Sequence, residues 1–334
     1  DITIGNILGS NILNILVILG LAASLTCIHV AKSTIFREIP FMILVSVLLL
    51  ILGLDGMDPR FSKAMVDEGK MPNLKKLIEL IIRGGWPGAV NLPVEQAALL
   101  PAEYLNAVID DDVYRIDGVK RNTTKMRLLL RSLARNESTT VTNRTLKNDI
   151  REMDDEDIDI NTVKDYLDIF ERLFIIDNQP PFSTGVRSSV RVKQAVKRHF
   201  SDPSLACSLL KVTPASLMGD LETLGFLFEA LCERDLKIYA ESFGGALYHY
   251  QDYQGREIDA VIELPDGQWC AFEIKLGANQ IDAAAQSLLN IQKEIADDPK
   301  GKPPAVLCVL CGMANAAYRR PDGVYVVPIT ALKN

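Results

Sequence analysis

Apolar and polar residues alternate along two neighbouring stretches of the chain, 258–264 and 270–276. This period of two predicts a pair of β-strands, and the Pro-Asp-Gly turn at 265–267 predicts that they form a hairpin. The apolar residues of both stretches have even position numbers, so they share one side of a sheet only if even positions pair with even positions. The position numbers of paired residues must then add up to an even number. We therefore expect a three-residue or bulged loop, with one face of the hairpin buried and the other face polar.

The polar face of this hairpin carries candidate chemistry. The expected register places Asp259 opposite Glu273 or Lys275. The carboxylates of Asp259 and Glu273 could hold a divalent cation such as Mg²⁺, and the lysine could stabilise an attacking water molecule or the charge that develops on a phosphate. The alternative is an ordinary polar surface on a half-exposed hairpin, which needs no function.

Helical periodicity dominates the region before the hairpin. Apolar residues recur at spacings of three and four in 96–111 and 125–135, and a shorter helix is predicted within 139–150. A longer amphipathic helix is expected after the capping pair Asn161-Thr162, and it runs into a strand. The acidic run 152–159 between these helices is expected to be a solvated loop.

Three short helices and a strand in this order are typical of a winged helix-turn-helix module. Three basic residues could face DNA phosphates there: Arg144, Lys147 and Lys164. Three acidic residues on the third helix would repel a DNA backbone: Asp165, Asp168 and Glu171. The pattern therefore predicts either a DNA-binding winged helix or an interaction module without DNA contact.

The last part of the chain predicts an α+β domain. A strong amphipathic helix is expected over 221–239, with Glu229 in its middle, and a helix over 281–295 that contains Gln286 follows the hairpin. Two further strands are predicted by apolar runs at 305–310 and 324–327. Helices and strands in this arrangement predict a sheet flanked by helices.

The first 54 residues differ from the rest because they are almost entirely apolar. Residues 11–30 form a run long enough for a helix that crosses a bilayer, and 39–54 form a shorter second run. Two membrane-type helices are therefore predicted, and membrane association through residues 11–54 is expected. The alternative is a pair of apolar helices buried in a soluble core.

Composition narrows the choice of partners. The 334 residues carry a net charge of −7, so only a local patch such as the basic stretch 187–198 could draw the chain to nucleic acid. The six cysteines include a CxxC at Cys308 and Cys311, but no second CxxC and no nearby histidine completes a zinc site. Reduced thiols in a cytoplasmic domain are therefore expected.

Two short segments resemble known families. The string GNILGSNILNILVILG resembles the α-repeat of sodium/calcium exchangers of the cation/Ca²⁺ antiporter family, which implies ion-site roles for Asn6, Ser10 and Asn11. Residues 51–77 resemble the start of type I phosphodiesterases of the alkaline phosphatase superfamily, in which Asp55 would ligate a metal. The sequence at each boundary between two segments is compatible with both neighbouring families. We therefore predict a mosaic chain that combines segments of different families.

A broader resemblance covers residues 78–334. The motifs IRGGWPGAV, TVKDYLDIFERLFIID and GREIDAVIELPDGQWCAFEIKLG resemble the C-terminal half, DUF4143, of archaeal-type AAA+ ATPases. The resemblance implies a winged helix followed by a PD-(D/E)XK nuclease-like domain. It also implies a set of nuclease-type residues: Glu229, Asp259, Glu273 and Lys275, with Gln286 as an accessory. The chain has no G-x-x-x-x-G-K-[ST] loop, so ATP is not expected as a cofactor.

Four segments follow from these patterns. Two apolar helices are expected over 1–56, a short connector over 57–77, a helical and winged-helix-like domain over 78–177, and a nuclease-like domain over 178–334. We expect a non-catalytic module that binds DNA or a protein partner. One alternative is a Mg²⁺-dependent nuclease, and the other is a membrane-bound exchanger fragment, which only residues 1–56 support.

Overall fold

The computed structural model describes residues 72–183, 193–299 and 301–332 of the chain. The chain divides into two compact units, residues 1–70 and 71–334, and the described residues all belong to the second unit. Several predictions therefore lie outside the described residues: the two apolar helices, the exchanger-type residues Asn6, Ser10 and Asn11, and the turn at Asp55. None of the described helices is long and apolar enough to cross a membrane.

Helices fill the first half of the described chain, as the periodicity predicted. They are α4 (Pro72–Arg83), α5 (Val94–Ala97), α6 (Leu99–Ala107), a π-helical turn (Val108–Asp112), α7 (Val113–Asp117), α8 (Thr123–Arg135), α9 (Asn143–Asp154), α10 (Ile160–Arg172), α11 (Pro203–Leu210) and α12 (Pro214–Gly219). The single helix expected over 96–111 is broken between α5 and α6. Pro101 accounts for this break, since its ring would clash with the carbonyl four residues earlier in a continuous helix.

Side-chain caps fix where the helices of the bundle begin. Asn122 accepts a hydrogen bond from the backbone of Lys125, and Thr142 accepts one from Thr145, so α8 and α9 start there. The cap of α10 is Asp159, two residues before the predicted Asn161-Thr162 pair. The loop predicted over the acidic run 152–159 is shorter than expected, because α9 continues to Asp154.

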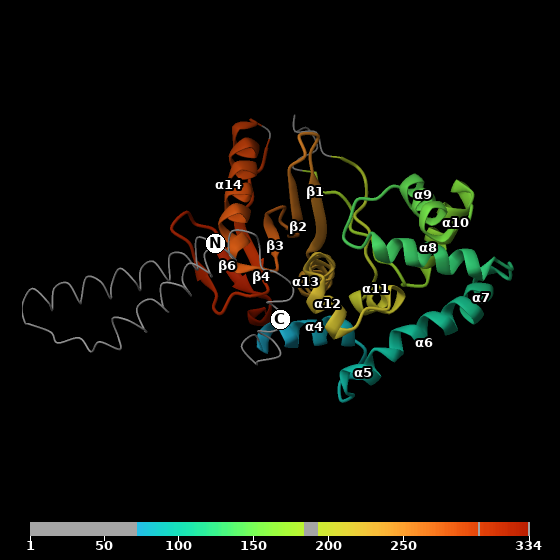
Figure 1. Ribbon diagram of the computed structural model, residues 1–334. Helices are drawn as coiled ribbons and strands as arrows, with labels where there is room; N and C mark the ends of the chain where they lie inside the picture. The colour runs from blue at the N-terminus through green and yellow to red at the C-terminus, as the bar shows by residue number, and fades with distance from the viewer. Residues whose placement is uncertain (1–71, 184–192, 300, 333–334) are drawn as a thin grey trace, which may run out of the picture. The chain divides into compact units, whose positions relative to one another are not determined.

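The second half of the molecule is built on a six-stranded sheet (Figure 1). Its strands are β1 (Ala246–Gln251), β2 (Glu257–Glu263), β3 (Trp269–Lys275), β4 (Val306–Cys311), β5 (Tyr318–Arg319) and β6 (Tyr325–Pro328), in the order β1-β2-β3-β4-β6-β5. The first three strands are antiparallel, whereas β4 runs parallel to both β3 and β6. Helix α13 (Leu221–Ser242) precedes the sheet and α14 (Ile281–Asp297) connects β3 to β4, which gives a mixed α+β domain.

The β2–β3 hairpin has the predicted register. Val261 pairs with Ala271 and Glu263 pairs with Trp269, so the position numbers of partners add up to an even number. The backbone N–H of Leu264 donates to the carbonyl of Gln268, which leaves the three-residue loop 265–267. Gly267 takes a φ of 76° there, in the region where glycine is favoured.

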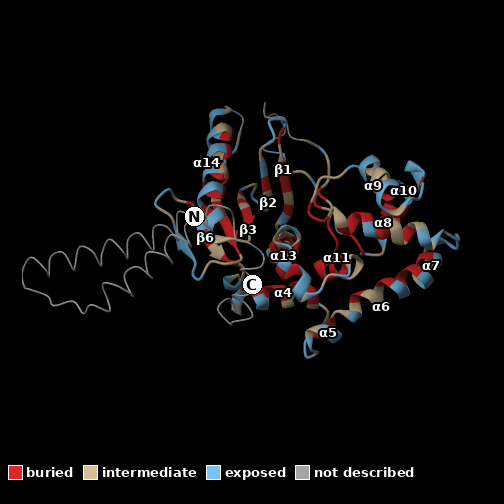
Figure 2. Ribbon diagram, in the orientation of Figure 1, coloured by how far each residue is buried: buried red, intermediate tan, exposed pale blue. Residues whose placement is uncertain are grey.

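The expectation of one buried and one polar face is wrong, because helices cover both sides of the sheet (Figure 2). Helix α14 packs over one set of alternate strand residues, which includes Val261, Ala271 and Val309. The intervening residues, such as Ala260 and Ile274, are buried as well, on the side contacted by α13. The set that includes Ala260 and Ile274 was the one expected to be buried, and the apolar residues Val261 and Ala271 on the expected polar face are core as well.

A β-bulge interrupts the pairing of β1 with β2. Tyr248 pairs with Val261 and Tyr250 pairs with Ile258, so two residues, Asp259 and Ala260, lie opposite His249 alone. The bulge takes the Asp259 carbonyl out of the regular ladder. This carbonyl instead accepts hydrogen bonds from side chains outside the sheet.

The residue pattern of 187–200 predicts a pair of strands, but the described part of this segment, 193–200, does not form one. Its residues make isolated bridges to other segments: Thr139 with Arg198, Ile176 with Phe200, and Gln179 with Lys197. The chain after α10 and the chain before α11 therefore run side by side next to the bulge. This arrangement brings Lys197 and His199 into the interior, where both are 7% exposed.

Candidate functional site

The hairpin brings together three of the predicted nuclease-type side chains. Nζ of Lys275 lies 3.0 Å from Oδ2 of Asp259 and 2.7 Å from Oε2 of Glu273. Oδ2 of Asp259 also accepts a hydrogen bond of 2.7 Å from the backbone N–H of Ile274. The Asp259 carboxylate is thus fixed by β3, and the lysine ammonium lies between the two acids.

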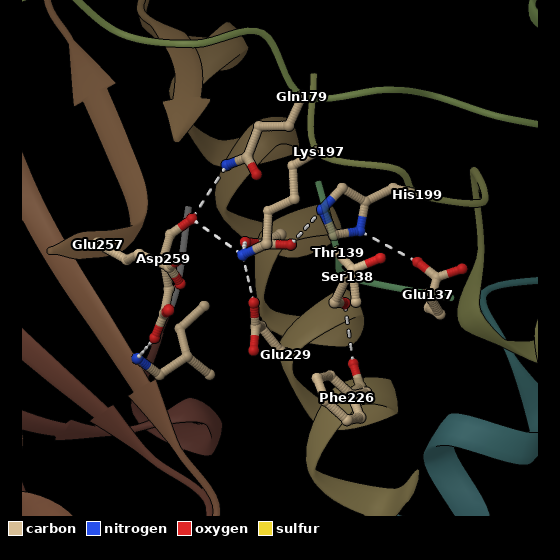
Figure 3. Close-up of polar contacts among 12 residues, drawn as sticks. Glu137, Ser138, Thr139, Gln179, Lys197, His199, Phe226, Glu229, Glu257 and Asp259 are labelled. Carbon is tan, nitrogen blue, oxygen red and sulfur yellow. Dashed lines mark hydrogen bonds and ion pairs between the residues drawn. The ribbon is translucent and has the colours of Figure 1, made fainter. Parts of the chain in front are cut away.

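The fourth predicted residue, Glu229, belongs to a second cluster of charges on α13 (Figure 3). Glu229 and Glu233 are four residues apart and so lie on the same face of that helix. Nζ of Lys197 donates to Oε1 of Glu229 and to Oε1 of Glu233, the latter at 2.8 Å. It also lies 3.4 Å from the Asp259 carbonyl, which links the two clusters through the bulge.

His199 extends this cluster towards the helical half of the molecule. Its Nδ1 lies 3.0 Å from Oε1 of Glu137, in the loop after α8, and its Nε2 lies 2.7 Å from Oε2 of Glu233. Both carboxylates and the imidazole are buried. An imidazole with a carboxylate at each nitrogen is expected to carry both protons, because the charged form then donates on both sides.

The environment shifts the titration of these groups in opposite directions. Burial alone would lower the pKa of His199, but Glu233 and Glu137 outweigh it and raise that pKa to about 9. Burial, reinforced by Asp259, raises the pKa of Glu273 to about 8. Burial also raises the pKa of Glu229 to about 8, although the nearby Lys197 ammonium opposes that shift. For Asp259 burial would raise the pKa, but Lys275 and Lys197 lower it overall.

A cavity of about 250 Å³ opens beside these clusters. Its wall includes Lys197, Glu229 and Asp259, and it continues along Thr139 to the exposed Glu257. Water therefore has a space next to the charged groups, although the groups themselves are largely enclosed.

The predicted metal ligands do not form an open donor set. Within 72–183, 193–299 and 301–332, no three His, Cys, Asp or Glu side chains converge as a metal site. The Asp259 and Glu273 carboxylates share the Lys275 ammonium, which occupies the place between them. Gln286 is exposed on α14 and donates to Oδ1 of Asn290 at 2.9 Å, so it is not part of the charged group.

The three residues predicted to face DNA phosphates lie on α9 and α10. Arg144 and Lys164 are exposed, whereas Nζ of Lys147 lies 3.3 Å from Oδ1 of Asp157. In the described part of the basic stretch 187–198, Lys197 points inward to Glu229 and Glu233, and Arg198 donates to Oδ1 of Asn143 at 2.8 Å. DNA contact by the bundle stays a prediction.

Sequence reasoning missed Lys197, His199, Glu137 and Glu233. One signal was available for Glu233, because it follows Glu229 by four residues on a helix. The other three are isolated charges whose partners are 32 to 62 positions away in the chain. No local pattern marks such pairs.

Comparison with protein families divides the chain into three segments. Residues 1–71 match the model for Sodium/calcium exchanger protein, 74–216 match Domain of unknown function (DUF8612), and 224–332 match Domain of unknown function (DUF4143). The predicted mosaic of an exchanger fragment and a DUF4143 region is confirmed. The DUF4143 match is narrower than the predicted 78–334, since residues 74–216 match a separate family.

Two curated proteins are similar to short parts of this chain. The Putative antiporter CaxA of Alkalimonas amylolytica is 54% identical over 48 residues, which are 14% of this chain and 15% of that protein. The Inner membrane protein YrbG of Escherichia coli (strain K12) is 53% identical over 47 residues, which are 14% of each chain. The chain therefore spans about a seventh of the length of these relatives. No solved structure matches the chain.

The charge cluster predicts how stability depends on pH. The pKa of His199 is raised to about 9 from 6.5, so its stabilising charge is fully present below 6.5 and is lost as pH rises through about 9. The pKa values of Glu229 and Glu273 are raised to about 8, so these two groups also reduce stability as the pH rises, because burial favours their neutral forms. Each group should lower the free energy of unfolding by up to about 1.4 kcal/mol per pH unit between its unfolded and folded pKa values, from 4.5 to about 8 for the two glutamates and from 6.5 to about 9 for His199. Urea denaturation at a series of pH values measures this.

The matched variants for this measurement are His199→Gln and His249→Gln. His199→Gln should be destabilised by about 3 kcal/mol at neutral pH and should show a shallower pH dependence. Burial lowers the pKa of His249 to about 4, so that residue is neutral throughout and its variant should keep the wild-type slope. Equal slopes in the wild type and His199→Gln would contradict the assigned charge.

Proposed function

We propose that residues 71–334 form a non-catalytic, protein-binding module of the kind attached to AAA+ ATPases. The observation that carries this proposal is the contact of the Lys275 ammonium with both Asp259 and Glu273, at 3.0 and 2.7 Å. A positive charge held between two carboxylates opposes the entry of a divalent cation by repulsion and by occupying their oxygens. The match of 224–332 to DUF4143 supports the association with ATPases.

The chemistry of the helical bundle favours a protein partner over DNA. Residues 143–172 contain ten acidic and five basic side chains, so their field repels a phosphate backbone. Met153 and Ile160, on either side of the acidic turn between α9 and α10, are 65% and 39% exposed. Apolar side chains beside acidic ones fit a partner surface that combines basic and apolar groups.

A labelled peptide of alternating lysine and leucine tests this partner chemistry. We expect salt-sensitive binding to the full chain, about tenfold weaker after Glu152→Gln, Asp155→Asn and Glu156→Gln together, because three exposed charges near the apolar pair are removed. Asp154 and Asp159 are left unchanged, since they hold Arg135 and cap α10. Fluorescence anisotropy gives the affinity.

The control for that experiment removes the same charge elsewhere. Glu95→Gln, Glu103→Gln and Glu222→Gln change three exposed glutamates outside the acidic turn and should leave peptide binding within about twofold. Equal weakening in both triple variants would indicate attraction to the net charge alone. Binding of a DNA duplex more tightly than the peptide would overturn the choice of a protein partner.

The second candidate function is a Mg²⁺-dependent nuclease, and one observation favours it. Glu273 and Asp259 are neighbouring carboxyls whose pKa values are shifted in opposite directions, upward by burial and downward by lysine. Divergent pKa values of this kind are common at catalytic centres. In that function Asp259 and Glu273 would hold the metal ion, which would supply charge neutralisation at the phosphate.

Plasmid nicking in the presence of Mg²⁺ separates the two candidates. The binding module predicts no cleavage above a metal-free blank for the wild type, Lys275→Ala or Lys237→Ala. The nuclease predicts cleavage that is lost at least about a hundredfold in Lys275→Ala and retained in Lys237→Ala, whose lysine pairs with Asp177 instead. Such a loss would replace the non-catalytic proposal.

We further propose that residues 1–71 attach the chain to a membrane, on the basis of their similarity to exchangers alone. Co-sedimentation of the full chain with liposomes tests this proposal. Ile15→Lys with Ile18→Lys should reduce the bound fraction severalfold, since a lysine in the hydrocarbon region costs about 3 kcal/mol. Ile15→Leu with Ile18→Leu should have no effect. Equal sedimentation of both variants would contradict the attachment.

A further inference from the structure

The Lys197 ammonium occupies a point where three oxygen atoms from two elements converge. Two are carboxylate oxygens of Glu229 and Glu233 on α13, and the third is the Asp259 carbonyl on β2. The side chain of Lys197 is 8% exposed, and the carboxylates keep its pKa well above the usual value although burial opposes this. The three N–H donors of an ammonium match three acceptors.

Two carboxylates and a backbone carbonyl are also the donors that Mg²⁺ and Mn²⁺ prefer. This group is distinct from the Asp259–Glu273 pair of the hairpin, because it uses the carbonyl of Asp259 and not the carboxylate. The β-bulge is what makes that carbonyl available to a cation.

Two further observations indicate a cation position. Gln179 donates its amide N–H to the same Asp259 carbonyl, and its Oε1 is buried without a hydrogen-bond partner in the described chain. The cavity of about 250 Å³ is lined by both Lys197 and Glu229, so water molecules can reach the point as additional ligands. A divalent ion at this point would have an oxygen-rich, partly hydrated environment.

We propose that Lys197 is a tethered cation in the position of a divalent metal ion, and that its removal opens a Mn²⁺ or Mg²⁺ site on Glu229, Glu233 and the Asp259 carbonyl. The inference goes beyond the proposed function and does not depend on the partner. It explains why α13 can keep two buried glutamates one turn apart. Without a cation between them, the ionised forms of both would repel each other in the interior, and this repulsion contributes to the raised pKa of Glu229.

Titration of the full chain with MnCl₂ tests the proposal, and electron paramagnetic resonance follows the loss of the free-ion signal. Lys197→Ala is expected to bind one Mn²⁺ per chain, and the wild type none at the same concentration. Thermal unfolding gives a second readout. Mn²⁺ at about 100 times its dissociation constant should raise the midpoint of Lys197→Ala by about 5 °C or more and leave the wild type unchanged. Lys197→Gln replaces Lys197→Ala if the latter does not fold.

Three further variants locate the bound ion. Adding Glu233→Gln to Lys197→Ala should abolish Mn²⁺ binding, whereas adding Glu273→Gln should leave it intact. Lys237→Ala, which removes a different ion-paired lysine that lies on α13, should behave like the wild type. Mn²⁺ binding by the wild type, a folded Lys197 variant without binding, or binding that depends on Glu273 would each overturn the proposal. Each of these results is separate from the outcome of the peptide experiment.

Discussion

A charge inside a protein is stable only next to an opposite charge, and this constraint determines how the two halves of residues 71–334 fit together. Glu137 lies after the bundle helix α8, Lys197 and His199 lie on the connecting segment, and Glu233 lies on α13. Taking an unpaired ion out of water costs several kcal/mol, so each of these groups requires its neighbour. The alternating row of acids and bases therefore holds the bundle, the segment and the long helix in one arrangement.

The β-bulge gives the sheet its part in this arrangement. A regular ladder would use the Asp259 carbonyl for pairing with β1, whereas the bulge turns it to Lys197 and Gln179. The Asp259 carboxylate contacts the neighbouring strand on the other side, β3, where it accepts hydrogen bonds from the backbone N–H of Ile274 and from Nζ of Lys275. One residue thus connects two charge clusters, with its backbone in one and its side chain in the other.

The parts of the fold that depend on local chemistry could be predicted from the sequence. The hairpin register followed from alternation and turn length, and the helices of the bundle followed from their apolar spacing. The burial of both sheet faces could not be predicted, because Val261 and Ala271 are apolar residues within a stretch whose charged neighbours suggested a polar face. The charge cluster was inaccessible for another reason. A lysine and a histidine between ordinary residues carry no sign that a bulge and a helix will enclose them.

The position of Lys197 shows why resemblance and order of elements are insufficient to assign chemistry. Glu229, Asp259, Glu273 and Lys275 occur in the expected order, and the strands bring the last three within contact distance. The fourth, Glu229, is directed to a lysine that comes from outside the helix and sheet that carry the motif. A lysine from a connecting segment can therefore supply the positive charge that buried glutamates would otherwise take from a bound metal ion. Function then follows from the contacts of the side chains, and the similarity of residues 224–332 to a family of unknown function leaves that choice open.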